Sequence, residues 1–357
     1  MGVRATGSRW SERFIAVVGL LAFGCASAGA PPAIAEAPDA AASLPAAVAA
    51  AAAPPERPAP AAVAAPPSLE ARLVEAKGWS WLVARLAADG VERSRAERSF
   101  ADPRIPPFDG LFFAVDPAEP RAMYRAVLGG RSVAQARACA GEYAHSFQAA
   151  ERATGVPAEV LAAILHVETR CGRNTGGSLV LYGLARLAMA NEPANVEANL
   201  VRRAVAGAVD PELEVRVRAR AAKLDEMFYP EVRAVFTLAD VEAVDPLEIR
   251  GSGSGAFGYP QFLPTSYLRF GTDGNGDGRI DLYDVDDAAA SAGAFLASHG
   301  WQGSLSREAR RRVIWHYNRS HAYIDAVLGL ADRLEGSVRS YYAGSPGDGG
   351  VPVEAAQ

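Results

Sequence analysis

Residues 155–170 read GVPAEVLAAILHVETR and predict one apolar helix with an acidic side chain near its end. Gly155 and Pro157 interrupt the helical pattern that precedes them, and Pro157 suits the first turn of a new helix. The predicted helix runs from about Ala158 to Thr169, because apolar residues recur there at helical spacing. Glu168 therefore lies against apolar surroundings, where desolvation raises a carboxyl pKa and keeps the group protonated. A protonated carboxyl group can serve as a general acid.

Glu168 alone is ambiguous. A single glutamate is more often a surface residue, here paired with Arg170 or Arg173. His166, two residues earlier, is more often a hydrogen-bonding partner than a catalyst. Other motifs must decide between the two interpretations.

A glycine-rich segment, residues 251–264, reads GSGSGAFGYPQFLP. Small residues let a backbone pass close to a ligand. Tyr259, Gln261 and Phe262 offer a stacking face and amide hydrogen bonds, which suit sugar rings. A flexible loop is the alternative, although the prolines within the segment argue against simple flexibility.

Residues 273–284 read DGNGDGRIDLYD and follow the pattern of an EF-hand calcium loop. Oxygen-bearing side chains fall at loop positions 1, 3, 5, 9 and 12, and glycine occupies position 6. The predicted Ca²⁺ ligands are Asp273, Asn275, Asp277, Asp281 and Asp284, with the backbone carbonyl of Arg279. Asp284 is one carbon shorter than the usual glutamate. We expect a structural ion that fixes the preceding glycine-rich loop; a polar loop without metal is the alternative.

The N-terminus predicts export. Arginines precede a short apolar run at residues 14–23, and small residues follow at 26–28, so residues 1–28 are interpreted as a signal peptide. Residues 21–25, LAFGC, resemble a lipoprotein processing site in which the cysteine is lipidated, which leaves outer-membrane anchoring through Cys25 open. Residues 29–67 are nearly all alanine and proline and predict a semi-extended linker. Both features predict a periplasmic protein.

The remaining chain predicts a mainly α protein. Helical patterns cover about 68–88, 132–153 and 178–191, and a charged stretch at about 196–225 predicts a solvated helical pair. No alternating pattern with hairpin turns appears. The chain of 357 residues is half hydrophobic, which excludes global disorder, and its formal net charge of −5 argues against nucleic-acid binding.

The three cysteines lack the spacing of a zinc site. Cys139 and Cys171 lie at equal offsets from Gly155, so an antiparallel pair of helices would bring their sulfur atoms together. After export they could oxidise to a disulfide that holds the loop after Glu168. Two separate apolar cysteines are the alternative.

Together these motifs resemble those of the membrane-bound lytic murein transglycosylase B family. The resemblance covers about Trp81 to Glu335. It rests on several motifs in the family's order, which are 155–170, Asp245-Pro246-Leu247, 258–264, the calcium loop, His299-Gly300-Trp301, and Tyr317-Asn318-Arg319-Ser320 with Tyr323.

The resemblance implies a lysozyme-like catalytic domain, here residues 68–340, followed by a flexible tail at 341–357. It implies that Glu168 is the catalytic acid/base, that Ser252, Asn318 and Tyr323 line the substrate cleft, and that Tyr259 and Gln261 belong to a sugar-binding loop. The implied reaction cleaves the MurNAc–GlcNAc bond of peptidoglycan glycan strands and forms 1,6-anhydroMurNAc. We expect a monomer.

Three alternatives remain. A hydrolytic muramidase would use the same acid but deliver water to the sugar. A non-catalytic peptidoglycan-binding protein would bind the glycan and release nothing. A calcium-responsive structural protein would change its partner binding with calcium and cleave no glycan.

Overall fold

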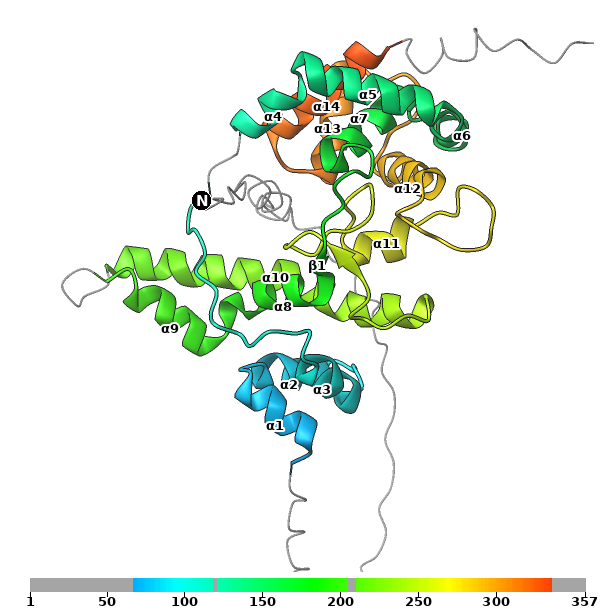
Figure 1. The fold of residues 1–357 in the computed structure, drawn as a ribbon. Helices are drawn as coiled ribbons and strands as arrows, with labels where there is room; N and C mark the ends of the chain where they lie inside the picture. The colour runs from blue at the N-terminus through cyan, green and yellow to red at the C-terminus, as the bar shows by residue number, and fades with distance from the viewer. Residues whose placement is uncertain (1–66, 118–120, 205–209, 336–357) are drawn as a thin grey trace, which may run out of the picture.

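The computed structural model describes residues 67–117, 121–204 and 210–335. The predicted signal peptide, the predicted tail and all but the last residue of the predicted linker lie outside these ranges. The described chain is mainly α, as expected, with one two-stranded sheet (Figure 1). Among the helices that the structure describes, none combines the length and the apolarity that a bilayer crossing requires.

In Figure 1 the N-terminal helices of residues 69–101 lie at the bottom and the long helix of residues 211–241 crosses the middle. The upper group combines the helices of residues 121–169 with the last helices of the described chain, residues 307–334. The bounds of the elements are α1 Leu69–Ala76, α2 Ser80–Ala88, α3 Arg93–Ala101, α4 Arg121–Val127, α5 Gly130–Glu142, α6 Ala144–Thr154, α7 Ala158–Thr169, β1 Ser178–Leu179, α8 Val180–Ala188, the 3₁₀ turn η1 Met189–Asn191, α9 Pro193–Val201, α10 Pro211–Val241, β2 Arg250–Gly251, α11 Pro264–Phe270, α12 Val285–Ser298, α13 Arg307–Tyr317 and α14 His321–Leu334.

Helix α7 lies at the centre of the upper group of helices, and its bounds agree with the prediction. It contacts α5, α6, α12 and α14. Nearly every side chain of α7 is buried, because a helix that is apolar on all sides must be covered on all sides. Pro157 stands at the N-cap, one residue before the first turn in which it was expected.

Two predicted helices are broken in the structure. The stretch 68–88 forms α1 and α2, separated at Gly78, whose φ of +76° ends the first helix. Ser68 caps α1 as its position predicts, since its side chain accepts from the backbone N–H of Ala71 at 3.0 Å. The stretch 132–153 forms α5 and α6, which meet at Tyr143.

The stretch 178–191 begins with strand β1 before it becomes α8 and η1. The predicted solvated pair at 196–225 corresponds to α9 and to part of α10, which continues to Val241. One face of α10, including Val217, Ala221 and Leu224, is buried, because the helix packs against α8. The expectation of a solvated pair was therefore wrong for that face.

Strands β1 and β2 pair antiparallel, with Ser178 opposite Gly251 and Leu179 opposite Arg250. This pairing ties the segment after α7 to the start of the glycine-rich loop. A Cβ atom at Gly251 would lie 2.2 Å from the carbonyl oxygen of Ala256. Glycine is thus required at this position by close approach of the protein's own backbone rather than by a ligand.

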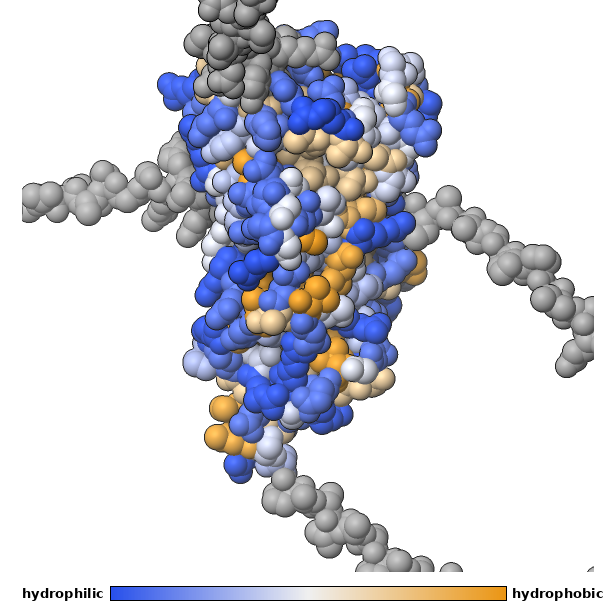
Figure 2. All heavy atoms as spheres, turned by 90° about the vertical axis from the view of Figure 1, so that its right-hand side faces the viewer, coloured by the Kyte–Doolittle hydropathy of each residue, from blue (hydrophilic) through white to orange (hydrophobic). Residues whose placement is uncertain are grey.

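The surface on the right-hand side of Figure 1 is mixed in character. Figure 2 shows hydrophilic residues over most of this face, with separate apolar patches between them. Large exposed apolar side chains in the described ranges include Leu69 and Leu73 of α1 and Val241 at the end of α10.

Candidate active site

Glu168 lies in the last turn of α7 and lines a cavity of about 360 Å³. Its side chain is partly exposed to this cavity. The hydroxyl of Tyr323, from α14, donates a hydrogen bond of 2.7 Å to Oε1 of Glu168. Tyr323 itself is 1% exposed and packs edge-on against Tyr124, with ring centroids 5.7 Å apart. Two helices far apart in the sequence therefore hold one carboxyl group at the edge of an open space.

Burial raises the pKa of Glu168 to about 8, and the hydrogen bond from Tyr323 opposes part of that rise. Although the carboxyl group reaches a cavity, the surrounding side chains keep most water away from it, and desolvation disfavours the ionised form. Burial likewise raises the pKa of Tyr323 and of Tyr317 well above the usual value, and the negative charge on Glu168 adds to both. At neutral pH Glu168 is mostly protonated and both phenols are neutral.

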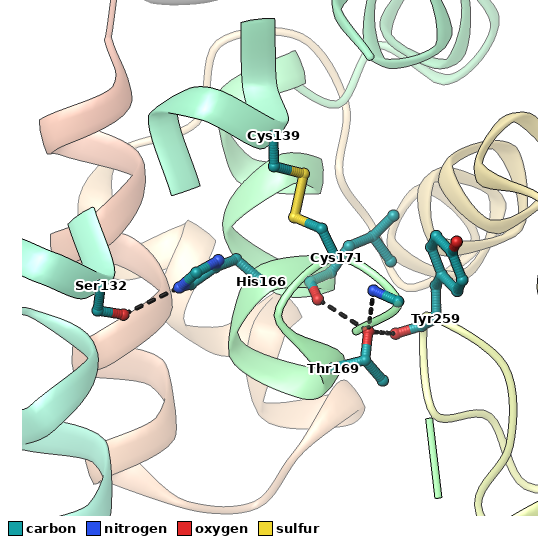
Figure 3. Close-up of a disulfide and its surroundings, with 8 residues drawn as sticks. Ser132, Cys139, His166, Thr169, Cys171 and Tyr259 are labelled. Atoms are coloured by element: carbon teal, nitrogen blue, oxygen red, sulfur yellow. Dashed lines mark hydrogen bonds between the residues drawn. A yellow bond between two sulfur atoms is a disulfide. The ribbon is translucent and has the colours of Figure 1, made fainter. Parts of the chain in front are cut away.

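The turn after Glu168 has an unusual backbone. Arg170, Cys171 and Gly172 all have left-handed φ angles, of 54°, 56° and 76°. Thr169 Oγ1 lies 3.1 Å from the carbonyl of Leu165 and 3.0 Å from that of Tyr259, and it accepts from the N–H of Gly172 at 2.9 Å (Figure 3). The threonine next to Glu168 thus joins α7 to the glycine-rich loop.

Cys139 of α5 and Cys171 form a disulfide, with sulfur atoms 2.06 Å apart and Cα atoms 6.4 Å apart (Figure 3). The sequence left this bond open, and the structure forms it. Because Cys171 lies three residues after Glu168, the bond fixes the end of the helix that carries the acid against α5.

Ser132 and His166 form a second polar pair beside the cavity (Figure 3). Ser132 Oγ lies 2.9 Å from Nε2 of His166, whereas the buried Nδ1 has no hydrogen-bond partner among the residues that the structure describes. Burial lowers the pKa of His166 to about 4, and the charges of Arg170 and Arg173 contribute. The imidazole is therefore neutral and a weak base, which agrees with the sequence-based interpretation of His166 as a partner rather than a catalyst.

The other predicted substrate residues, Ser252, Tyr259, Gln261 and Asn318, are not among the described residues that line this cavity. Ser252 is 3% exposed, and its hydroxyl accepts from the N–H of Ala256 at 3.1 Å. The amide of Gln261 donates to the carbonyls of Thr175 and Gly258, at 3.1 Å and 3.0 Å. Both side chains thus hold the loop in shape.

Tyr259 lines a neighbouring cavity of about 230 Å³ that includes both disulfide cysteines. Asn318 is half-buried at the end of α13, directly after Tyr317. The hydroxyl of Tyr317 donates to the carbonyl of Pro260 at 2.5 Å, so this helix end is joined to the glycine-rich loop.

Sequence reasoning missed Ser132, Gln135 and Asn174, which are polar residues of the Glu168 cavity. A signal for two of them was present. Ser132, Gln135 and Cys139 are spaced three and four residues apart and therefore share one helix face. A bond between Cys139 and Cys171, which the sequence left open, would turn this face of the helix toward the loop that follows Glu168.

In the predicted calcium loop the side-chain oxygens accept from the loop's own backbone. Asp273 accepts from the N–H groups of Gly276 and Gly278, at 2.6 Å and 2.8 Å. Asp284 is the N-cap of α12, where it accepts from the N–H of Asp286 at 2.8 Å. In the described ranges no three acidic, histidine or cysteine side chains gather as they would around a metal ion.

Asp287, which the loop pattern does not include, lies beneath this loop and is 1% exposed. It accepts from the N–H groups of Gly274 and Asp281, at 2.8 Å and 2.6 Å, while burial raises its pKa. The oxygen-rich donor set fits a hard cation such as Ca²⁺. The buried carboxylate of Asp287 offers a further ligand to that set.

Comparison with solved structures agrees with this fold. Slt35 of Escherichia coli, a lytic transglycosylase solved in complex with calcium, superposes with a TM-score of 0.53 at 21% identity, and the alignment covers 72% of this chain and 93% of that one. SltB3 from Pseudomonas aeruginosa, solved in complex with NAG-anhNAM-pentapeptide, gives a TM-score of 0.55 at 20% identity, covering 75% and 80%. At these identities the likeness shows the fold.

Comparison of sequences assigns the family. The membrane-bound lytic murein transglycosylase B of Escherichia coli K12 is 34% identical over 160 residues, which is 45% of this chain but only 36% of that relative. A family model described as the transglycosylase SLT domain matches residues 74–311. That match takes in most of the chain, including Glu168, the glycine-rich loop and the predicted calcium loop, and the chain therefore belongs to the transglycosylase SLT domain family.

Proposed function

We propose that this protein is a lytic transglycosylase that cleaves the β-1,4 bond between MurNAc and GlcNAc in peptidoglycan. The observation that carries the proposal is Glu168, whose pKa is raised to about 8 by burial at the edge of an open cavity. Such a group is protonated at neutral pH and can give its proton to a glycosidic oxygen. The activity named for the Escherichia coli relative, murein transglycosylation, supports the same assignment.

A single carboxyl group is enough for the proposed reaction. Ordinary glycosidases use two, whereas Glu168 is the one carboxyl group among the described residues that line its cavity. Glu168 donates its proton to the oxygen that leaves with GlcNAc, and the MurNAc acetamido group stabilises the positive charge that develops at C1. The Glu168 carboxylate then takes the proton of the MurNAc 6-hydroxyl, and O6 closes onto C1. The acid is regenerated and no water is consumed.

Tyr323 is a positioning residue in this scheme. Its hydroxyl donates to Oε1 of Glu168, which leaves Oε2 to face the substrate. The same hydrogen bond stabilises the carboxylate that forms after the first proton transfer. Because Tyr323 is buried and its pKa is high, it remains a donor throughout the working pH range.

We propose that Ser252, Tyr259, Gln261 and Asn318 contribute to the remaining substrate cleft. The internal hydrogen bonds of Ser252 and Gln261 support a role in holding the backbone of the glycine-rich loop in one conformation. That loop meets the catalytic helix through the contact between Thr169 and the carbonyl of Tyr259. Such preorganisation keeps a bound sugar aligned with Glu168.

We further propose a structural Ca²⁺ bound by the oxygens of the 273–284 loop. Its candidate ligands are Asp273, Asn275, Asp277, the carbonyl of Arg279, Asp281, and Asp284 or Asp287. A link to the candidate site supports this role, since the N–H of Tyr259 donates to the carbonyl of Leu282 at 2.8 Å. An ion there would stiffen the support of the glycine-rich loop. The relative Slt35 was solved in complex with calcium.

The proposed location is the periplasm, with the protein acting as a monomer on glycan strands. The predicted signal peptide supports export, and the membrane-bound relative supports anchoring through Cys25. A test is metabolic labelling with a fatty-acid analogue in wild type and in Cys25→Ser. Label in the wild type alone supports anchoring, and its absence from both contradicts it.

The activity is tested by incubating the mature protein with purified sacculi, with and without calcium, and identifying the released fragments by mass spectrometry. We expect anhydromuropeptides from the wild type and none from Glu168→Gln, which keeps the side-chain shape but cannot supply the proton. Undiminished release by the variant would refute the assignment of Glu168. Glu248→Gln, at an exposed glutamate, is the matched control.

A further inference from the structure

Helix α5 is joined to the segment around Glu168 at two places. The disulfide from Cys139 to Cys171 lies after Glu168, and the contact from Ser132 to His166 lies before it (Figure 3). Ser132 and Cys139 are about two helical turns apart, so they lie on one face of α5. Because this face is held at both of its ends, Ser132 has a fixed position in the wall of the Glu168 cavity.

The surroundings of the two ring nitrogens of His166 indicate which one carries the proton. The imidazole is neutral at pH 7, since burial lowers its pKa to about 4, and a neutral imidazole has one N–H and one lone pair. Nδ1 is buried without a partner among the described residues, whereas Nε2 lies 2.9 Å from Ser132 Oγ. A buried N–H without an acceptor is rarer than a buried lone pair without a donor. The proton therefore belongs on Nε2.

With this tautomer, His166 donates to Ser132 Oγ and leaves the hydrogen of the serine hydroxyl to another acceptor. Among the described residues, this hydroxyl has no partner other than His166. Ser132 is partly exposed and lines the same cavity as Glu168. A hydroxyl that accepts one hydrogen bond becomes a stronger donor in the next. The pair thus presents a directed O–H donor to a molecule in the cavity.

Resting on the proposed function, we infer that Ser132 is a substrate-binding residue, whose hydroxyl donates to an acceptor oxygen of the glycan strand, and that His166 is its positioning residue. Sugars carry hydroxyl, ring and acetamido oxygens, so acceptors are present wherever the strand enters the cavity. The serine and the neutral imidazole carry no charge, which suits an uncharged sugar. The proposed proton transfers use Glu168 alone, so Ser132 contributes equally to binding of the substrate and of the transition state.

Binding is measured with Glu168→Gln protein, so that no cleavage occurs. The ligand for isothermal titration calorimetry is soluble glycan strands from which an amidase has removed the peptides. Adding Ser132→Ala should weaken binding about fivefold, which corresponds to about 1 kcal/mol. Ser132→Thr keeps the hydroxyl and should bind like the parent. Ser94→Ala, at an exposed serine in the first turn of α3, is the matched control and should leave the affinity unchanged.

Kinetics with Glu168 intact separate substrate binding from a merely structural role. Ser132→Ala should raise KM about fivefold and leave kcat unchanged, because a contact made in both states contributes to binding alone. A fall in kcat at unchanged KM would mean that Ser132 only holds α5 against α7, and would overturn the inference. Equal affinity of Ser132→Ala and its parent, or equal weakening by Ser132→Ala and Ser132→Thr, would overturn it as well.

The tautomer of His166 is read by ¹⁵N NMR on histidine-labelled Glu168→Gln protein, with the His166 signals identified by their loss in His166→Gln. We expect a proton on Nε2 and none on Nδ1 at pH 7. A proton on Nδ1 would overturn the positioning role of His166. These binding and NMR measurements do not depend on cleavage. A wild type that cleaves no sacculi would therefore refute the proposed function and leave both of them readable.

Discussion

Replacing Glu168 by glutamine should stabilise the fold while it removes the activity. The pKa of Glu168 rises from 4.5 to about 8 in the folded protein. The folded state therefore holds a proton that the unfolded chain releases, and the stability contributed by this group is present below pH 4.5 and is lost as the pH rises toward 8. Glutamine is neutral in both states and is not subject to this loss.

The magnitude follows from the pKa difference. Each pH unit between the two pKa values corresponds to about 1.4 kcal/mol, so full burial would give an advantage of up to about 5 kcal/mol for the variant above pH 8. Because Glu168 is partly exposed to its cavity, we expect about 3 kcal/mol. The glutamine oxygen can still accept the hydrogen bond from Tyr323, so that contact is retained.

The assay is guanidinium denaturation of wild type and Glu168→Gln at pH 4, 7 and 8.5. The free energies of unfolding should agree at pH 4 and diverge in favour of the variant as the pH rises. Glu248→Gln, which removes an exposed negative charge, should follow the wild type. A difference that is independent of pH, or a variant less stable than wild type at pH 8.5, would refute the reasoning.

Three further perturbations act on the same region. Tyr323→Phe removes the 2.7 Å hydrogen bond that lowers the pKa of Glu168, so the fall in kcat on the alkaline side should move to higher pH; an unmoved profile contradicts the contact. Changing Cys139 and Cys171 to serine removes a disulfide between residues 32 apart in the sequence. The free energy of unfolding, measured by denaturation, should fall by about 4 kcal/mol. Equal stability of the wild type with and without reductant contradicts that figure. Calcium should raise the melting temperature of the wild type but not of Asp277→Asn, and an equal response of both proteins contradicts the proposed ion site.

The central helix and its acid were predictable because the information is local. Helix α7 begins and ends where the apolar periodicity and the flanking glycine and proline place it. The cap of α1 is equally local, since Ser68 accepts from a backbone N–H only three residues away. The breaks at Gly78 and Tyr143 were missed because a helix can tolerate both residue types, and tertiary packing decides whether it continues.

The rest of the site depends on contacts between distant segments. Tyr323 meets Glu168 across 155 residues, and only the family resemblance pointed to it. Ser132 pairs with His166 across 34 residues, and although Ser132 shares a helix face with Cys139, no pattern in the sequence identified His166 as its partner. Asp287 was missed because the loop pattern ends at Asp284, whereas the structure buries the later carboxylate beneath the loop. Periodicity and motif spacing contain no information on such pairs.

The most direct test of a single carboxyl group acting first as acid and then as base is to run the reaction in ¹⁸O-labelled water. The wild type is incubated with purified sacculi, and the new MurNAc ends are analysed by mass spectrometry. Internal attack by the 6-hydroxyl predicts anhydro ends that contain no ¹⁸O. Reducing ends that carry one ¹⁸O atom would show that water attacks C1, and would contradict the account.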